Sequence, residues 1–196
     1  MPSSKSWIAR HKNGAFFSLV AIVLVAVVCT GVLAGVNYSL KPAFAEADAR
    51  LDEAKGGEQR KLLFPDAKSF TSKTAPAVEG LNSVYQADTG EWVFDVTSSE
   101  GYHGDVELMV GITADGKVAG LQVVAEDETD GIGTNALSED YFGSFKDMDA
   151  KGELTTDEAG SGQTHVDAVS GATFTSHAVV GCLNIAFEAY AQMGGN

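Results

Sequence analysis

Apolar residues recur along three consecutive segments in the middle of the chain, and in 105–113 they alternate with other residues so that Val106, Leu108, Val110 and Ile112 share one face. The segments 91–99, 105–113 and 116–126 are rich in β-branched and aromatic residues, as strands are. Between the second and the third, Asp115-Gly116 is a strong signal for a tight hairpin turn. Strands joined by tight turns pair antiparallel, because parallel strands need long crossover connections. The pattern therefore predicts an antiparallel sheet.

The C-terminal segment repeats its apolar residues with the period of a helix instead. Thr175 or Ser176 is expected as the N-cap, and Gly194-Gly195 should end this helix. A shorter helix is expected to begin near Ser138. The fold class is therefore α+β, with a single domain in which helices flank the sheet. The apolar stripe of the C-terminal helix consists of Val179, Leu183, Ala186, Phe187 and Tyr190.

The N-terminal pattern differs, because residues 15–36 contain no charged side chain. A membrane-spanning helix needs about 20 predominantly apolar residues, so we expect 15–36 to be a transmembrane helix. Lys5, Arg10 and Lys12 precede it, and basic flanks prefer the cytoplasm. The domain that follows should then lie on the extracytoplasmic side of the cell membrane. The sequence AFA at 43–45 resembles a signal cleavage site, so removal of the helix is an alternative.

These patterns divide the chain into parts with different expected roles. Helix-forming residues in the connector predict a helix over 44–54 and a second short one ending near Phe64. The predicted parts are a cytoplasmic N-terminus (1–14), the transmembrane helix (15–36), a juxtamembrane connector (37–72) and the extracytoplasmic domain (73–196).

Charge separates the N-terminal region from the domain. The formal net charge is −14, and all 27 Asp and Glu residues lie beyond residue 36. An acidic domain repels a phosphate backbone, so nucleic acid is not an expected partner. Cys29 and Cys182 fall in separate predicted helices, which excludes a disulfide framework. No Cys/His cluster has the spacing of a zinc site, and no metal site is predicted.

The glycine-rich segment 131–136 spells G-x-G-x-x-A, part of a dinucleotide-binding fingerprint. A Rossmann unit needs a parallel crossover, whereas a predicted hairpin precedes this segment. The acidic EDETD at 126–130 would also repel a pyrophosphate. We therefore favour a loop whose glycines let some ligand approach the backbone closely.

The stretch VDAVSGATFTS at 166–176 combines several hydroxyls at the entrance of the predicted C-terminal helix. It lacks the G-x-S-x-G elbow, and no base is well placed to activate Ser170 or Thr173, so no catalytic residue is assigned. A helix N-terminus offers free N–H groups and partial positive charge, which suit a phosphate. The alternative is that both hydroxyls only serve the turn and the cap.

Two motifs resemble those of the FMN-binding domain family. DAVSGAT at 167–173 is similar to its flavinylation motif D-x-x-[ST]-G-A-[TS]. ETDGIG at 128–133 resembles its E-T-P-G-[LI]-G loop, although Asp130 replaces the proline and Glu126 stands where histidine is common. In that family a flavin transferase joins FMN to the last hydroxyl of the motif through a phosphoester. The resemblance thus implies covalent FMN on Thr173.

The resemblance also implies roles for neighbouring residues. The residues before Thr173 would shape the turn and offer backbone donors to the phosphate, and the glycine-rich loop would approach the flavin ring. Asp167 would be recognised by the transferase. The further cofactor-binding residues implied are Ser170, Gly171, Ala172, Glu128, Thr129, Gly131 and Gly133.

Nearly the whole chain is similar to the G subunits of Rnf electron-transport complexes, which are homologous to the C subunits of sodium-pumping NADH:quinone oxidoreductases, and the diagnostic residues cluster at 102–135 and 166–177. This implies a membrane-anchored flavoprotein electron carrier in an ion-translocating ferredoxin:NAD+ oxidoreductase, with no substrate turnover by this chain alone. Its partners would be the A, B, C, D and E subunits, and the flavin transferase during maturation. The alternatives are the FMN-binding subunit of a related NADH:quinone oxidoreductase, a stand-alone extracellular flavin electron-transfer protein, and a flavin-free anchored binding module.

Overall fold

The structure is a computed structural model that describes residues 18–31, 35 and 56–195. The chain divides into two compact units, Met1–Leu51 and Asp52–Asn196. Each unit is described by itself.

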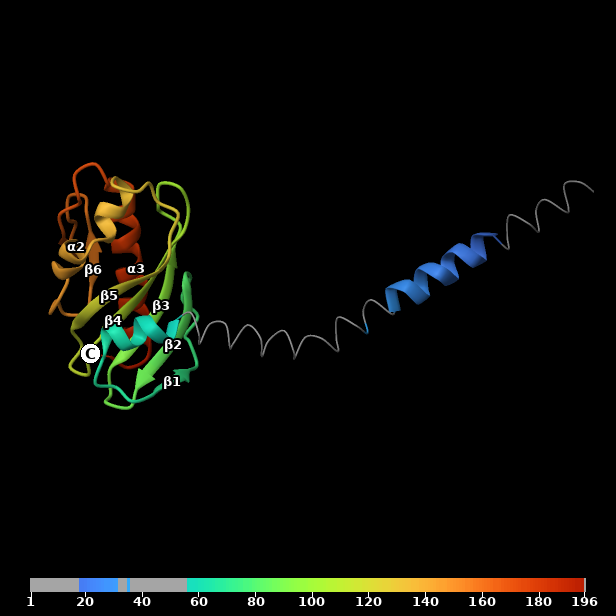
Figure 1. The fold of residues 1–196 in the computed structure, drawn as a ribbon, viewed down its shortest axis with the longest axis horizontal. Helices are drawn as coiled ribbons and strands as arrows, with labels where there is room; N and C mark the ends of the chain where they lie inside the picture. The colour runs from blue at the N-terminus through green and yellow to red at the C-terminus, as the bar shows by residue number, and fades with distance from the viewer. Residues whose placement is uncertain (1–17, 32–34, 36–55, 196) are drawn as a thin grey trace, which may run out of the picture. The chain divides into compact units, whose positions relative to one another are not determined.

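In the first unit, residues 18–31 form a helix with exposed apolar side chains (Figure 1). Across the part of the chain that the structure describes, no helix is both long enough and apolar enough to cross a membrane. Both ends of the predicted span 15–36 lie outside the described residues, as do the predicted helix over 44–54 and the segment 43–45.

The second unit is built around a five-stranded sheet in the order β1-β2-β3-β4-β5, with every neighbouring pair antiparallel (Figure 1). The three predicted strands are confirmed as β3, β4 and β5, and the Asp115-Gly116 turn joins the last two. The strands are β1 (Phe70–Lys73), β2 (Leu81–Ala87), β3 (Trp92–Ser98), β4 (Val106–Ile112) and β5 (Val118–Ala125).

The hydropathy pattern does not predict β1 and β2. No residue of β1 is buried, and β2 buries only Val84 and Ala87. Their alternation is therefore too weak to detect along the sequence, and pairing with β3 determines their conformation.

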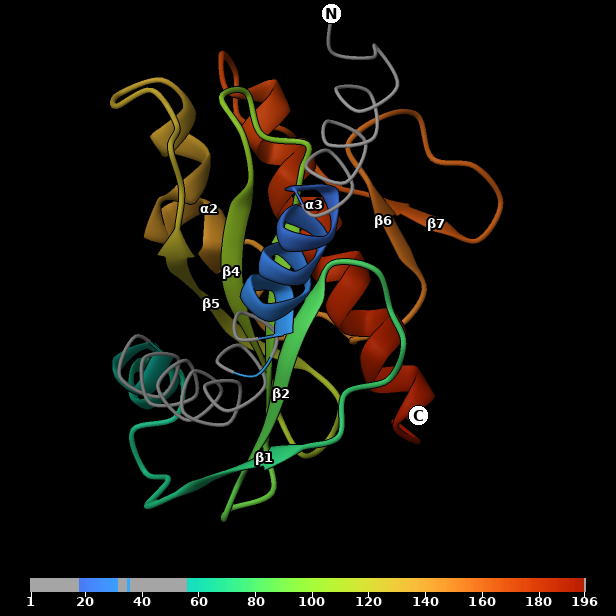
Figure 2. The ribbon, with the colours of Figure 1, turned by 90° about the vertical axis from the view of Figure 1, so that its right-hand side faces the viewer.

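Helix α3 (Thr173–Gln192) packs against one face of the sheet (Figure 2). All five residues of the predicted apolar stripe are buried there, together with Phe94, Leu108 and Val110 of the sheet. Burial of each of the larger side chains, such as Leu183 and Phe187, stabilises the fold by about 1.5–3 kcal/mol. Cys182 lies in the same core, and burial raises the pKa of its thiol to about 12.

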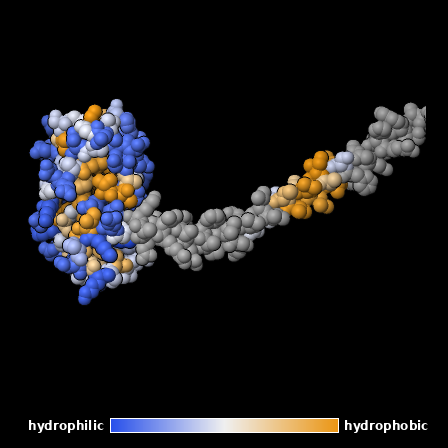
Figure 3. Space-filling model, viewed as in Figure 1, coloured by the Kyte–Doolittle hydropathy of each residue, from blue (hydrophilic) through white to orange (hydrophobic). Residues whose placement is uncertain are grey.

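A helix over residues 56–63 contributes to a smaller apolar cluster on the second unit. It confirms the short helix predicted to end near Phe64, and Phe64 packs in this cluster with Val93 and Met109 of the sheet. The Arg60 guanidinium lies 4.1 Å from the ring centroid of Tyr85, a cation–π contact. Figure 3 shows hydrophobic residues gathered over the sheet on the visible face of this unit.

The shorter elements lie between β5 and α3. They are η1 (Gly133–Leu137), α2 (Glu139–Gly143), β6 (Glu153–Thr155) and β7 (Gln163–His165). The predicted helix near Ser138 is confirmed as α2, since the Ser138 hydroxyl accepts a hydrogen bond from the Tyr141 N–H and caps the helix.

The short strands β6 and β7 pair in parallel, and α3 holds this pair in place (Figure 2). The Asn184 side chain on α3 accepts a hydrogen bond from the Leu154 N–H (2.8 Å) and donates one to the Leu154 carbonyl (2.9 Å). Both backbone groups of Leu154 are thereby satisfied by one amide. These two hydrogen bonds attach β6 to α3. Because β7 pairs with β6, they also fix the position of the turn that leads from β7 into α3.

Candidate functional site

The stretch 166–176 forms a turn after β7 and the first residues of α3. Gly171 has φ +83, a conformation that side chains with a Cβ rarely adopt. The turn is closed by a hydrogen bond from the Ala172 N–H to the Val169 carbonyl (2.9 Å). Ala172 is buried, and α3 begins directly after it. The backbone therefore presents the start of α3 at the surface.

The expectation that Thr175 or Ser176 caps α3 is wrong. The helix begins at Thr173, its N-cap is Ala172, and no side chain caps it. The Ser176 hydroxyl instead accepts a hydrogen bond from the Val169 N–H (3.0 Å) and donates one to the Ala172 carbonyl (2.9 Å). It thus ties the preceding turn to the helix from within the first turn, as serine hydroxyls can.

The other hydroxyls of the stretch are at the surface. Ser170 and Thr173 are exposed, and neither side chain makes a hydrogen bond within the part of the chain that the structure describes. The Thr173 hydroxyl lies in the first turn of α3, where backbone N–H groups have no partner within the helix. An exposed oxygen beside such donors is accessible to a modifying enzyme and to a phosphate.

The loop after β5 faces this turn. Its backbone is held by hydrogen bonds from the Gly131 N–H to the Thr134 hydroxyl (2.9 Å) and from the Asn135 amide to the Gly131 carbonyl (2.9 Å). The Glu128 N–H donates to the Glu126 carboxylate (2.6 Å). The sheet is antiparallel here, which excludes the Rossmann interpretation of 131–136.

One hydrogen bond joins the first turn of α3 to the loop motif at 128–133, across 47 positions of sequence. The Thr175 hydroxyl donates to Glu128 Oε2 at 2.7 Å, and Thr175 is buried. The His103 N–H approaches the other carboxylate oxygen, Oε1, at 3.4 Å. A Cβ on Gly133 would lie 2.5 Å from Glu128 Oε2 and 3.0 Å from the Thr175 hydroxyl, so only glycine allows this close approach.

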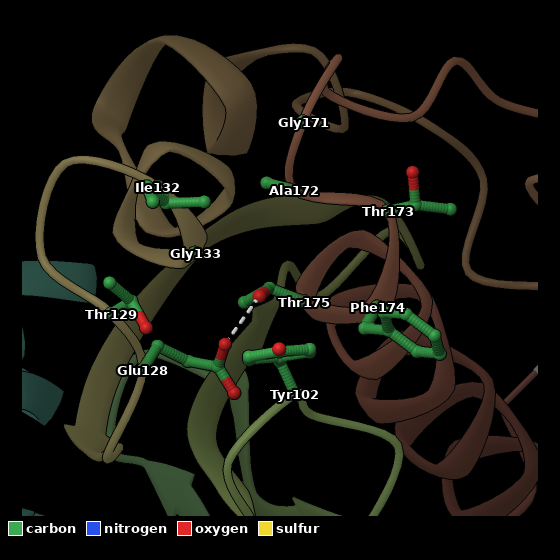
Figure 4. A pocket seen from close by; sticks show the side chains of 10 residues that line it. All are labelled: Tyr102, Glu128, Thr129, Ile132, Gly133, Gly171, Ala172, Thr173, Phe174 and Thr175. Carbon is green, nitrogen blue, oxygen red and sulfur yellow. Dashed lines mark hydrogen bonds between the residues drawn. The ribbon is translucent and has the colours of Figure 1, made fainter.

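Between the two motifs lies a cavity of about 330 Å³ (Figure 4). Figure 4 shows Ile132 and Thr129 on one side and Phe174 and Thr173 on the other, with Tyr102 and Glu128 between them. This volume falls at the lower end of the range of about 300–1,000 Å³ typical of small-molecule sites. The lining residues are Tyr102, Glu128, Thr129, Ile132, Gly133, Gly171, Ala172, Thr173, Phe174 and Thr175.

Most residues singled out in the two motifs meet at this cavity, and three lie beside it. Ser170 and Gly131 are neighbours of lining residues in the chain but do not line the cavity. Asp167 is fully exposed and pairs with His165, with 3.5 Å between Oδ1 and Nε2. Among the described residues, no group of His, Cys, Asp and Glu side chains could hold a metal ion.

Sequence reasoning missed four lining residues: Tyr102, Ile132, Phe174 and Thr175. Tyr102 comes from the loop between β3 and β4, where no motif marked it. Ile132 occupies the [LI] position of the loop motif, but the motif alone does not show that its side chain reaches a cavity, and Phe174 directly follows the flavinylation motif. Their clustering depends on the fold.

Tyr141 of α2 supports the motif turn from the core. Its ring packs in the same apolar cluster as Ala172. Burial raises the pKa of Tyr141, while the nearby Ser176 hydroxyl acts in the opposite direction. The phenol therefore stays neutral at physiological pH.

Comparison with known proteins identifies the class of the domain. The family model for the FMN-binding domain matches residues 101–188, a segment that contains both motifs and every residue that lines the cavity. Residues 101–188, which include the cavity, are therefore similar to an FMN-binding domain.

Relatives that align over most of the chain show which protein family it belongs to. The chain is 30% identical over 173 residues to the G subunit of the proton-translocating ferredoxin:NAD(+) oxidoreductase complex of Clostridium ljungdahlii, covering 87% of this chain and 88% of that protein. It is 26% identical over 193 residues to the G subunit of the Na(+)-translocating ferredoxin:NAD(+) oxidoreductase complex of Acetobacterium woodii, covering 88% and 89%. The chain belongs to the G-subunit family of ion-translocating oxidoreductase complexes.

A solved structure is also similar. It is the C subunit of the Na(+)-translocating NADH-quinone reductase from Parabacteroides distasonis, with a TM-score of 0.46 and 19% sequence identity. The match covers 58% of this chain and 61% of that chain.

Proposed function

We propose that this protein is a flavoprotein electron carrier, one subunit of an ion-translocating ferredoxin:NAD+ oxidoreductase complex, with FMN bound covalently through a phosphoester to Thr173. The proposal rests on the exposed Thr173 hydroxyl at the start of α3, beside a cavity of small-molecule size. The relatives named as G subunits of such complexes support the electron-transfer role.

The residues at the cavity fit an FMN group in three respects. The Thr173 hydroxyl is exposed and has no hydrogen-bond partner among the described residues. Its oxygen would attack the phosphorus of a flavin nucleotide that the transferase holds as a phosphoanhydride; the O–H proton would go to solvent, the phosphoanhydride bond would break, and the remaining nucleoside monophosphate would leave. The first turn of α3 supplies unpaired N–H groups and the positive end of the helix dipole to a phosphate. Gly171 and Ala172 carry little or no side chain, which lets the phosphate approach the backbone.

The flavin ring would then lie in the cavity, against the loop after β5. Glu128 and Thr129 would face the ring. Gly131, with its positive φ, and Gly133, which lies against Glu128 and Thr175, would allow the backbone conformation of the loop. Ser170 would complete the turn, and Asp167, exposed outside the cavity, would serve recognition by the flavin transferase.

FMN would supply the redox chemistry, while the protein would supply position and electrostatics. The Glu128 carboxylate lies beside the cavity and is fixed by the Thr175 hydroxyl. A fixed negative charge disfavours the gain of negative charge by a nearby group. The chain itself would turn over no substrate, because electrons would pass through the bound flavin to and from other subunits of the complex.

The proposal includes membrane attachment through residues 15–36, with the domain on the extracytoplasmic side. The charge-free apolar run and the basic residues before it support this arrangement. Protease added to intact cells or spheroplasts should digest the domain, and the protein should stay in the membrane fraction after a salt wash. Recovery of the domain in the cytosol would refute this part of the proposal.

The covalent bond can be tested on a denaturing gel viewed under ultraviolet light. The full-length chain co-expressed with a flavin transferase should give a fluorescent band, and Thr173→Ala should abolish it. Ser161→Ala is the matched control, because it removes an exposed hydroxyl that lies outside both motifs and does not line the cavity, and it should keep the band. A dark wild-type band in the presence of a transferase that labels another substrate protein would contradict the proposal.

A further inference from the structure

Exposed apolar side chains are concentrated at the cavity. Within residues 56–195, the exposed large hydrophobic residues are Leu62, Tyr102, Ile132 and Phe174, and the last three all line the cavity. We refer to Tyr102, Ile132 and Phe174 as the apolar rim. Single exposed apolar residues are ordinary, whereas a group that gathers at one opening marks a binding surface.

Two residues of the apolar rim form an aromatic pair. The ring centroids of Tyr102 and Phe174 lie 5.8 Å apart with an interplanar angle of 44°. Tyr102 comes from the loop between β3 and β4, and Phe174 from the first turn of α3. Figure 4 shows Ile132 on the other side of the cavity. The rings stay 63% and 61% exposed despite this contact, so each still has apolar surface available.

The position of Thr173 indicates what covers this surface. Thr173 lines the same cavity and directly precedes Phe174, so a group attached to its hydroxyl is tethered next to the apolar rim. A flavin ring system is flat and largely apolar on its faces, and it carries polar groups at its edges. The cavity offers apolar side chains around its opening, and Glu128 and Thr129 as polar groups.

We propose that the apolar rim binds the isoalloxazine ring of the tethered FMN and shields it from water, with Tyr102 in contact with the ring. This inference rests on the proposed function, because it needs FMN on Thr173. Tyr102, Ile132 and Phe174 are positioning residues in it. Contact with the flavin ring would displace water from the exposed surfaces of the rim. This is favourable, because the free energy gained grows with the apolar area that is removed from water.

Two optical properties of the bound flavin report on this contact separately. A tyrosine in contact with an excited flavin transfers an electron to it and takes the electron back, which quenches fluorescence with no net oxidation. Phenylalanine has a similar shape but is not oxidised in this way. Iodide quenches a flavin only when it can reach the ring, so it reports on shielding.

The experiment uses the full-length chain, labelled in cells by a flavin transferase and solubilised in a mild detergent. Tyr102→Phe should raise the fluorescence per flavin several-fold and leave the bimolecular rate constant for iodide quenching, which is the Stern–Volmer constant divided by the flavin lifetime, unchanged, because the cover remains and the quencher is lost. Phe174→Ala and Ile132→Ala should increase this rate constant, because they open the cover. Phe174→Leu should restore shielding. Iodide is added at constant high ionic strength, since this acidic protein otherwise repels the anion.

Leu62→Ala is the matched control. Leu62 is 62% exposed, as the rim residues are, but it does not line the cavity. This variant should match the wild type in both measurements. Unfolding every variant in urea should bring the fluorescence per flavin to one common value, which shows that differences arise in the folded protein.

The results separate the two proposals. Absence of labelling of the wild type, with an active transferase, contradicts the proposed function. Labelling of the wild type, combined with rim variants that behave like Leu62→Ala in both measurements, overturns the inference and leaves the proposed function intact. The apolar rim would then be free to contact a partner protein instead.

Discussion

Two pairs of hydroxyl groups lie within one short stretch of this chain and have opposite surroundings. Ser170 and Thr173 are exposed and make no side-chain hydrogen bond among the described residues. Thr175 and Ser176 are buried, and each hydroxyl is hydrogen-bonded. The inner pair holds the site together, and the outer pair is left accessible. Residue type alone does not distinguish a structural hydroxyl from one available for chemistry; burial and hydrogen bonding do.

This comparison predicts that substitutions of the inner pair, Thr175 and Ser176, lower the free energy of unfolding. Substitutions of the outer pair, Ser170 and Thr173, should leave it nearly unchanged. The full-length protein can be compared by urea unfolding followed by tryptophan fluorescence, since Trp92 lies in β3. The expected effects decrease from Ser176 through Thr175 to Thr173.

Ser176→Ala should have the largest effect on stability. It removes two hydrogen bonds and leaves the Val169 N–H without its partner. We expect a loss of about 2 kcal/mol, because an unsatisfied backbone group costs roughly 1–3 kcal/mol. The melting temperature should fall by about 4–8 °C for a unit of this size. Ser170→Ala is the control and should unfold at the wild-type urea concentration; equal unfolding of the two variants would contradict the comparison.

Thr175→Val should have an intermediate effect. It keeps the shape of the side chain and removes the hydrogen bond to Glu128. The expected loss is about 1.5 kcal/mol, at the low end for hydrogen bonds to charged groups, because Glu128 is only half-buried. Thr175→Ser keeps the hydroxyl and should recover most of this loss. If the valine variant proved as stable as the wild type, the hydrogen bond between Thr175 and Glu128 would contribute nothing to the stability of the fold.

The sequence allowed prediction of the parts of the fold that have local periodicity. The strands β3, β4 and β5, the buried stripe of α3 and the capped start of α2 follow from alternation, helical spacing and turn residues. The strands β1 and β2 could not be predicted, because they are short or bury few residues and depend on pairing with β3.

The same distinction applies to the site. The two motifs could be found in the sequence because each is a continuous run with turn or hydroxyl residues at fixed spacing. Three features could not: the hydrogen bond between Thr175 and Glu128, the contribution of Tyr102 and the exposure of Phe174. Each depends on residues far apart in the chain or on which side of the first helical turn faces solvent. The error over the N-cap has the same origin, since Ser176 bonds to a turn that only the fold places behind it.

Thr173→Ala should have the smallest effect on stability and the largest effect on the cofactor. Its hydroxyl is exposed and has no partner within the described residues, so the loss should stay within about 0.5 kcal/mol, as for other surface substitutions. The covalent flavin should nevertheless be absent, and Thr173→Ser should restore it because the hydroxyl returns at the same position. Urea unfolding of the unlabelled proteins measures the first effect, and in-gel fluorescence after co-expression with the transferase measures the second. A stability loss as large as that of Ser176→Ala would mean that Thr173 supports the helix start, which would remove the physical basis for assigning it a different role from the inner pair.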